Sequence, residues 1–243
     1  MDNVTERDAH LRISADLMMF LPVSRRRERH RIAIGGSSTL GHHVESAGIP
    51  LTEVGPMTVD GRGVGPSYQP AAGDLIEVRP IPRPQPLPRE PRFLLDVHLG
   101  TLARRLRLLG LDTAYHNDMD DPALVVQANE ERRVLLTQDR GLLRRRALWL
   151  GAYVRGSRPH DQLRDLLERF TPPLRPWTRC TACNGELTPV EKREVLPVLE
   201  AGTRHAYDAY GRCQECGHVY WHGAHSGHLE EIVATARQWA ATG

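Results

Sequence analysis

The sequence predicts a multidomain chain of mixed α/β and α+β architecture, and three observations support this prediction. Two short apolar runs, residues 93–95 and 133–137, each lead into an aspartate and then into a helical pattern, which is typical of strands in a parallel sheet. Six prolines fall within residues 80–91, Pro80 and Pro91 included, and separate this region from the residues before it. Four cysteines, all in the last third of the chain, form two Cys-x-x-Cys pairs.

The overall charge excludes a strongly basic protein. Lysine and arginine number 32 against 30 acidic residues, so the formal net charge is +2, and Lys192 is the only lysine. This preference for arginine reflects either a GC-rich genome or the planar guanidinium fork that suits phosphate. No apolar run approaches the roughly 18 residues that a membrane helix needs, and no secretion signal is visible. We therefore expect a cytoplasmic protein with no membrane partner.

Residues 1–80 predict a ubiquitin-like β-grasp domain. Strand and helix patterns follow one another in the order β-β-α-β-β, which is the order of that fold. The expected elements are a strand within residues 9–21, a strand at 31–34, a helix that is capped at 37–39 and ends at 48, and strands at 57–59 and 75–78.

Residues 92–172 follow a proline-rich linker, residues 81–91, and predict a domain built on a parallel sheet. Strands and helices alternate along it, which implies right-handed crossover connections. The expected elements are a strand at 93–95, a helix at 99–109, a strand at 111–115, a helix from Asp121-Pro122, a strand at 133–137, a helix at 142–150, a strand at 152–154 and a helix at 161–170.

Residues 173–243 contain the cysteine pairs and a closing helix at 230–241. The pairs have the spacing of two zinc knuckles, with 29 residues between them. In a reducing compartment such pairs bind metal, and four thiolates make a closed, structural zinc site. The sequence therefore predicts a zinc ribbon that folds only with its metal. Its ligands are Cys180, Cys183, Cys213 and Cys216.

Aspartates gather at one edge of the predicted parallel sheet. Asp96 and Asp139 each follow a strand and precede a helix, and Asp120 and Asp121 precede the helix between them. Carboxyl ends of parallel strands share an edge, so these carboxylates converge there unless each only caps the helix that it precedes. Oxygen ligands favour a hard ion, magnesium or manganese, and such sites hydrolyse phosphodiesters.

Several stretches resemble one known family. The stretches Phe93–Asp96, Leu102–Asp112 and Val134–Leu142 resemble the Mut-seven C-terminal RNase domain, a variant of the PIN nucleases. The stretches 48–54, 59–61 and 73–78 resemble the ubiquitin-like domain that precedes it. The chain runs from residues 73–78 into prolines, so it has no exposed Gly-Gly end like that of a sulfur carrier.

The resemblance implies a PIN-like fold and a ribonuclease that cuts RNA with acidic residues holding magnesium or manganese. By resemblance, Asp96 and Asp139 match acidic positions of the PIN site, and Asp120 or Asp121 supplies a third. PIN domains usually carry a fourth acid, for which Asp161 is the nearest candidate.

Three arginines lie beside the expected acidic site: Arg104, Arg107 and Arg140. They either contact RNA phosphates or only lie on the solvent-exposed faces of their helices. The expected partner is RNA, single-stranded or a structured small RNA, while the β-grasp unit either binds a partner or covers the nuclease. Two functions follow from the sequence: a metal-dependent ribonuclease, or a non-catalytic RNA-binding or adaptor protein with a degenerate site.

Overall fold

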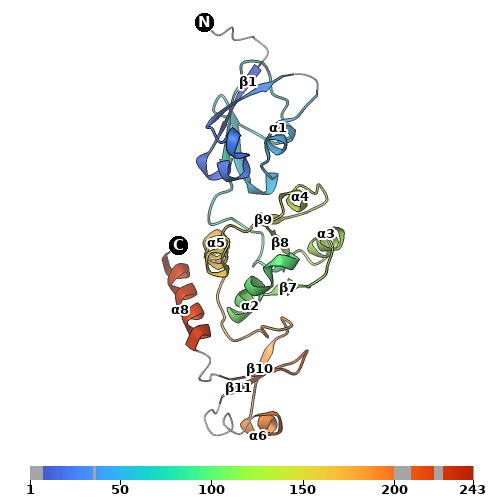
Figure 1. Ribbon diagram of the computed structural model, residues 1–243, viewed down its shortest axis with the longest axis vertical. Helices are drawn as coiled ribbons and strands as arrows, with labels where there is room; N and C mark the ends of the chain where they lie inside the picture. The colour runs from blue at the N-terminus through green and yellow to red at the C-terminus, as the bar shows by residue number, and fades with distance from the viewer. Residues whose placement is uncertain (1–7, 35–36, 200–208, 222–226, 243) are drawn as a thin grey trace. The chain divides into compact units, whose positions relative to one another are not determined.

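A computed structural model describes residues 8–34, 37–199, 209–221 and 227–242 (Figure 1). The chain divides into two compact units, the first made of residues 1–82 and 137–153, and the second of residues 83–136 and 154–243. The segment 137–153 thus belongs with the N-terminal part of the chain, although it lies far from it in sequence. In the described part of the chain, every helix is too short or too polar to cross a membrane.

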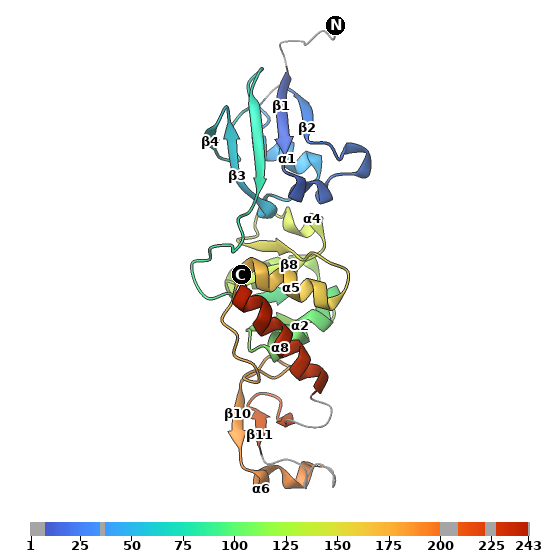
Figure 2. The same cartoon turned by 90° about the vertical axis from the view of Figure 1, so that its left-hand side faces the viewer.

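The first unit contains the predicted β-grasp. Its elements are β1 (Asp8–Ile13), β2 (Arg29–Ala33), α1 (Leu40–Ala47), β3 (Val54–Val59), β4 (Arg62–Val64) and β5 (Leu75–Pro80), with short 3-10 helices η1 (Ala15–Phe20), η2 (Val23–Arg25) and η3 (Leu51–Glu53). The strand order is β2-β1-β5-β3-β4 (Figure 2). The strands β1 and β5 pair in parallel and the other pairs are antiparallel, which confirms the β-grasp and adds β4 to the predicted strands.

The apolar pattern of the sequence explains the core of this unit. Alternate residues of β1 are buried, because successive side chains of a strand point to opposite faces. Leu40 and Val44 of α1 pack into the same core. The predicted strand within residues 9–21 is wrong beyond Ile13, because Leu17 and Phe20 are three residues apart and share one face of the 3-10 helix η1.

The second unit contains most of the parallel sheet. The strands β6 (Phe93–Leu95), β7 (Thr113–Tyr115) and β8 (Val134–Thr137) run parallel, and the sheet order is β7-β6-β8-β9, where β9 is Gly151–Tyr153. All residues of β6 and β8 are buried, as expected of a sheet covered on both faces. This confirms the predicted parallel sheet.

Helices alternate with these strands. They are η4 (Val97–Leu99), α2 (Gly100–Leu108), α3 (Asp121–Glu130), α4 (Arg140–Leu143) and α5 (Pro159–Phe170). The predicted helix at 142–150 is wrong, since only Arg140–Leu143 is helical. Leu142 is followed three and four residues later by Arg145 and Arg146, so no apolar face continues. The helix α2 ends before Gly110, whose φ of +81° suits glycine.

The proline-rich segment after β5 packs onto α5 within the second unit. Gln85 donates its backbone N–H to the carbonyl of Arg169, and its side-chain oxygen accepts from Arg169 Nε at 2.8 Å. Arg83 donates to the Asp165 carboxylate at 2.6 Å. These contacts hold in place a segment that the sequence predicts to be a linker. The division of the chain at residues 80, 91 and 172 stays a prediction.

The cysteine module forms a small antiparallel sheet of order β10-β11-β12. Its elements are β10 (Leu187–Val190), α6 (Lys192–Val195), η5 (Leu196–Val198), β11 (Tyr210–Cys213) and β12 (Val219–Trp221), followed by α8 (Gly227–Thr242). The last helix packs against α5, where the rings of Trp239 and His160 lie 4.9 Å apart. The predicted closing helix is therefore present and begins three residues earlier than expected.

Candidate functional site

The four cysteines form one compact cluster, and their sulfurs all lie within 4.8 Å of one another. Cys180 Sγ lies 3.6 Å from Cys216 Sγ, and Cys183 Sγ lies 3.4 Å from Cys213 Sγ. A disulfide would need about 2.05 Å. Zinc bonds of about 2.3 Å in a tetrahedron place the sulfurs about 3.8 Å apart. The donor set therefore fits structural zinc, as the sequence predicts.

The Tyr220 hydroxyl supports this cluster from β12, because it lies 3.0 Å from Cys180 Sγ. Burial raises the pKa of Cys180, but hydrogen bonds with Tyr220 and nearby backbone outweigh it and bring the pKa to about 6. Burial and the same contact raise the pKa of Tyr220 to about 12. A cysteine with a lowered pKa is more readily a thiolate, which is the form that binds metal. Burial and hydrogen bonds with the other three sulfurs instead raise the pKa of Cys183 to about 12.

The first knuckle is tied to the parallel sheet through Asn184. Its side-chain oxygen accepts from the backbone N–H of Thr113 at 2.8 Å, and its amide donates to Asp112 Oδ1 at 2.8 Å. Asp112 also accepts from Arg133 at 2.7 Å and from Arg92 at 2.9 Å. Burial would raise the pKa of Asp112, but these hydrogen bonds outweigh it and hold the pKa below its usual range.

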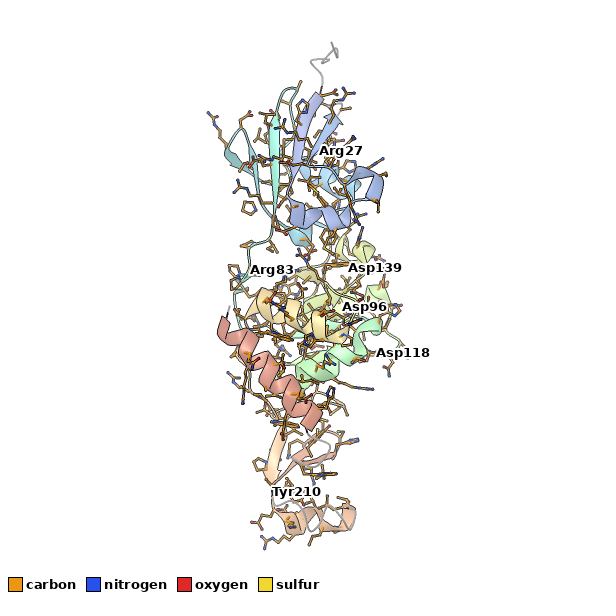
Figure 3. All side chains as sticks on the ribbon, turned by 60° about the vertical axis from the view of Figure 1, so that its left-hand side comes forward. Arg27, Arg83, Asp96, Asp118, Asp139 and Tyr210 are labelled. Carbon is orange, nitrogen blue, oxygen red and sulfur yellow. The ribbon has the colours of Figure 1, made fainter. Side chains whose placement is uncertain are left out.

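The predicted acidic residues follow the carboxyl ends of parallel strands. Asp96 comes directly after β6 and donates its backbone N–H to Leu136 O of β8 at 3.0 Å. Asp139 comes two residues after β8, which pairs with β6 in the register Leu95 to Leu136. Asp96 is only 7% exposed, whereas Asp139 is exposed. Figure 3 labels both side chains.

Each of these aspartates also caps a helix. Asp96 Oδ1 accepts from Val97 N at 2.6 Å, and Asp139 Oδ1 accepts from Gly141 N at 2.6 Å. The cap of α3 is Asp120, which accepts from Ala123 N, and Asp121 is the first residue of the helix, where the sequence predicts it to begin. Among the described residues, the only group of three or more metal-binding side chains is the cysteine cluster. Asp96 and Asp139 thus each follow the carboxyl end of a parallel strand, and no described carboxylates form a ready-made group of three or more.

The three candidate RNA-binding arginines have different surroundings. Arg104 on α2 is exposed, and no hydrogen bond or ion pair with a described residue engages it. Arg107 is 4% exposed and donates to the carbonyls of Thr113, Thr181 and Ala182. Arg140 donates to two carbonyls of η1. The geometry therefore leaves Arg104 available to a ligand and gives Arg107 and Arg140 structural partners within the chain, and RNA contact by the three arginines stays a prediction.

A cavity of about 450 Å³ lies at the end of β7 in the second unit. Arg104 and Arg107 line it from α2, His116, Asn117 and Asp118 from the loop after β7, and Ala182 from the first knuckle. The loop residues 116–118 were not predicted from the sequence, although their position directly after a strand was a signal. Asp118 is labelled in Figure 3. Asp161 lies in the first turn of α5 with an exposed side chain and does not line this cavity.

Comparison with known proteins gives two family matches. Residues 91–233 match the family described as Mut7-C RNAse domain, and residues 6–86 match the one described as Mut7-C ubiquitin. Two crystal structures of small archaeal modifier protein 1 from Haloferax volcanii are similar to part of the chain. One has 16% identity over 30% of this chain and 94% of its own, with a TM-score of 0.24. The other has 17% identity over 34% and 98%, with a TM-score of 0.25. None of the curated proteins compared matches the chain.

Proposed function

Because the chain belongs to the Mut7-C RNAse domain family and carries a Mut7-C ubiquitin domain before it, we propose that it is a divalent-metal-dependent ribonuclease. The family membership indicates a nuclease role on RNA. The observation that supports metal-dependent hydrolysis is the position of Asp96 and Asp139 after adjacent parallel strands. Open α/β sheets use this edge for their chemistry.

The donor set suits magnesium or manganese. Asp96 and Asp139 offer carboxylate oxygens, the ligands of hard cations, and Asp120 or Asp121 would add a third. Magnesium is commonly held by one or two carboxylates together with waters and substrate phosphates. The absence of a complete carboxylate cage among the described residues is therefore compatible with an ion that enters together with RNA. The bound ion would supply charge for activating water and for stabilising the leaving oxygen.

The residues of this chain have separate roles in the proposed reaction. Asp96 is held by its own cap hydrogen bond and by the strand contact to Leu136, so its carboxylate has a fixed orientation. Asp139 is fixed in the same way by the amides of Gly141 and Leu142. Preorganised carboxylates need no rearrangement when the ion and RNA arrive.

The cavity after β7 supports RNA contact by the second unit. Arg104 and His116 are exposed, and neither is engaged by a described residue. Both are suited to phosphate, which positions RNA without reading its sequence. We therefore place an RNA phosphate beside Arg104 in the proposal, and Arg107 serves as the buried wall of the cavity rather than as a direct contact.

One observation favours a second candidate, a non-catalytic RNA-binding or adaptor protein. The carboxylates of Asp96, Asp120 and Asp139 each accept hydrogen bonds from the helix that follows, and a capping role alone would explain their positions. The two candidates therefore differ in whether the negative charge of these residues is needed.

Asparagine substitutions separate the two candidates, because asparagine caps a helix about as well as aspartate but lacks its charge. Purified protein is incubated with labelled single-stranded RNA and Mn²⁺. We expect Asp96→Asn and Asp139→Asn to lower cleavage about a hundredfold or more, as with other groups that stabilise transition-state charge. The control is Asp60→Asn in an exposed turn of the first unit, which should cleave like the wild type. Undiminished cleavage in both site variants would refute the proposal, and binding without cleavage in the wild type would favour the adaptor.

A further inference from the structure

The segment 137–153 has close contacts with the β-grasp, and both belong to the first unit. The segment begins at Thr137, the last residue of β8, carries Asp139 on the N-terminal side of α4, and ends in β9. The contacts lie at both of its ends, and each involves a side chain whose partner is more than 90 residues away in sequence.

At the first end, Arg140 bonds the end of η1. Its Nη1 donates to Phe20 O at 2.7 Å and its Nη2 donates to Met19 O at 3.1 Å. The guanidinium also lies over the Phe20 ring, 5.4 Å from the ring centroid. The last carbonyls of a helix lack partners within the helix and carry partial negative charge, so a guanidinium fork satisfies two of them at once.

At the other end, Tyr153 packs into the β-grasp. Its backbone N–H donates to the Glu53 carboxylate at 2.7 Å, and Glu53 is only 1% exposed. Its ring meets the Phe20 ring edge to face, with centroids 5.0 Å apart. Phe20 therefore contacts both ends of the segment, through Arg140 and through Tyr153.

Asp139 lies directly beside the first of these anchors. It is the residue before Arg140, and its carboxylate accepts from the amides of Gly141 at 2.6 Å and Leu142 at 3.4 Å. On the strand side, its own amide donates to Thr137 Oγ1 at 2.8 Å. The helix α4 has only four residues, too few to be stable alone, so its place depends on such tertiary anchors.

We propose that the ubiquitin-like part of the chain acts as a positioning element for Asp139, with Arg140 as the positioning residue. The fork of Arg140 holds the N-terminal turn of α4 against η1, and this sets the direction of the neighbouring carboxylate. The inference rests on the proposed function in so far as Asp139 is a metal ligand. It gives the β-grasp a role within the enzyme that requires no further protein.

The first test measures the order of α4 without any metal. Amide hydrogen exchange at Gly141 and Leu142 is followed by NMR in the full chain, with Arg146→Ala as the matched control because Arg146 is exposed in the same segment. We expect exchange about tenfold faster or more in Arg140→Ala, since two charge-assisted hydrogen bonds are lost. Arg140→Lys should be intermediate, because it keeps the charge but not the fork. The amide of His42, which Thr39 caps on α1, reports general unfolding and should not change.

The second test measures the consequence for the carboxylate. Mn²⁺ binding to the full chain is measured by titration, and kcat and KM are measured with labelled RNA. We expect Arg140→Ala to bind Mn²⁺ several-fold more weakly and to lower kcat while KM for RNA stays unchanged, and Arg146→Ala to match the wild type.

The outcomes separate this inference from the proposed function. Unchanged exchange at Gly141 and Leu142 in Arg140→Ala, or an equal increase at His42, overturns the positioning role whatever the activity. If Asp139→Asn loses Mn²⁺ binding but Arg140→Ala does not, the proposed function stands and the inference fails. If Asp139→Asn binds Mn²⁺ like the wild type, the proposed role of Asp139 as a metal ligand fails. The exchange result then still decides whether Arg140 holds α4 in place.

Discussion

Substitution of Asn184 by alanine tests how the cysteine module is attached to the parallel sheet. The side chain donates one hydrogen bond to the Asp112 carboxylate and accepts one from the backbone N–H of Thr113, a residue that is fully buried. A hydrogen bond to a charged group contributes about 1.5–3 kcal/mol, and a stranded buried donor costs about 1–3 kcal/mol. Because the two losses share one site, we expect a total of about 3 kcal/mol.

Zinc release in rising urea, followed with a colorimetric chelator, measures this loss where it occurs. With a slope of about 2 kcal/mol per molar urea, a loss of about 3 kcal/mol lowers the midpoint by about 1.5 M. Asn184→Gly is the matched variant, since Asn184 has a φ of +75° that glycine adopts without strain. It should be less destabilised than Asn184→Ala by about 1 kcal/mol. A midpoint for Asn184→Ala within about 0.3 M of the wild type would refute the reasoning.

Two further predictions concern the metal and the charge network. Cys183→Ser should lower the zinc content well below one ion per chain, because a hydroxyl does not replace a thiolate ligand; metal analysis after gel filtration checks this, and full occupancy would contradict it. Asp112 has a lowered pKa in the folded chain, so its stabilisation is complete above the unfolded pKa of about 4 and is lost as the pH falls through the folded value. The gap in thermal stability between the wild type and Asp112→Asn should therefore be widest near neutral pH and shrink below about pH 4, and a constant gap would count against this account.

The sequence predicts best what local chemistry determines. The zinc ligands are visible because cysteine spacing constrains them, and Asp96 and Asp139 are visible because an apolar strand precedes each. The partners of Arg140 could not be predicted, because they are backbone carbonyls about 120 residues away, and such carbonyls have no sequence signature. The partners of Arg107, the carbonyls of Thr113, Thr181 and Ala182, likewise have no sequence signature.

The limits of helices were harder to predict. Asp120 and Asp121 are both good caps, and only the backbone geometry before Pro122 selects Asp120. The predicted helix at 142–150 is wrong because the prediction relied on its leucines alone. Positions 145 and 146, which would continue the apolar face from Leu142, are arginines.

The contacts of Tyr153 with the β-grasp have a consequence for truncated fragments of the chain and for the evolution of its two family regions. A fragment that stops between the two family matches, near residue 86, would retain Glu53 and Phe20 but lose the partners that both have in segment 137–153. Recombination between relatives at the same place would join a β-grasp to a segment that did not evolve against it. The two family regions are therefore expected to be inherited as a pair, with compensating changes concentrated at Phe20, Arg140 and Tyr153.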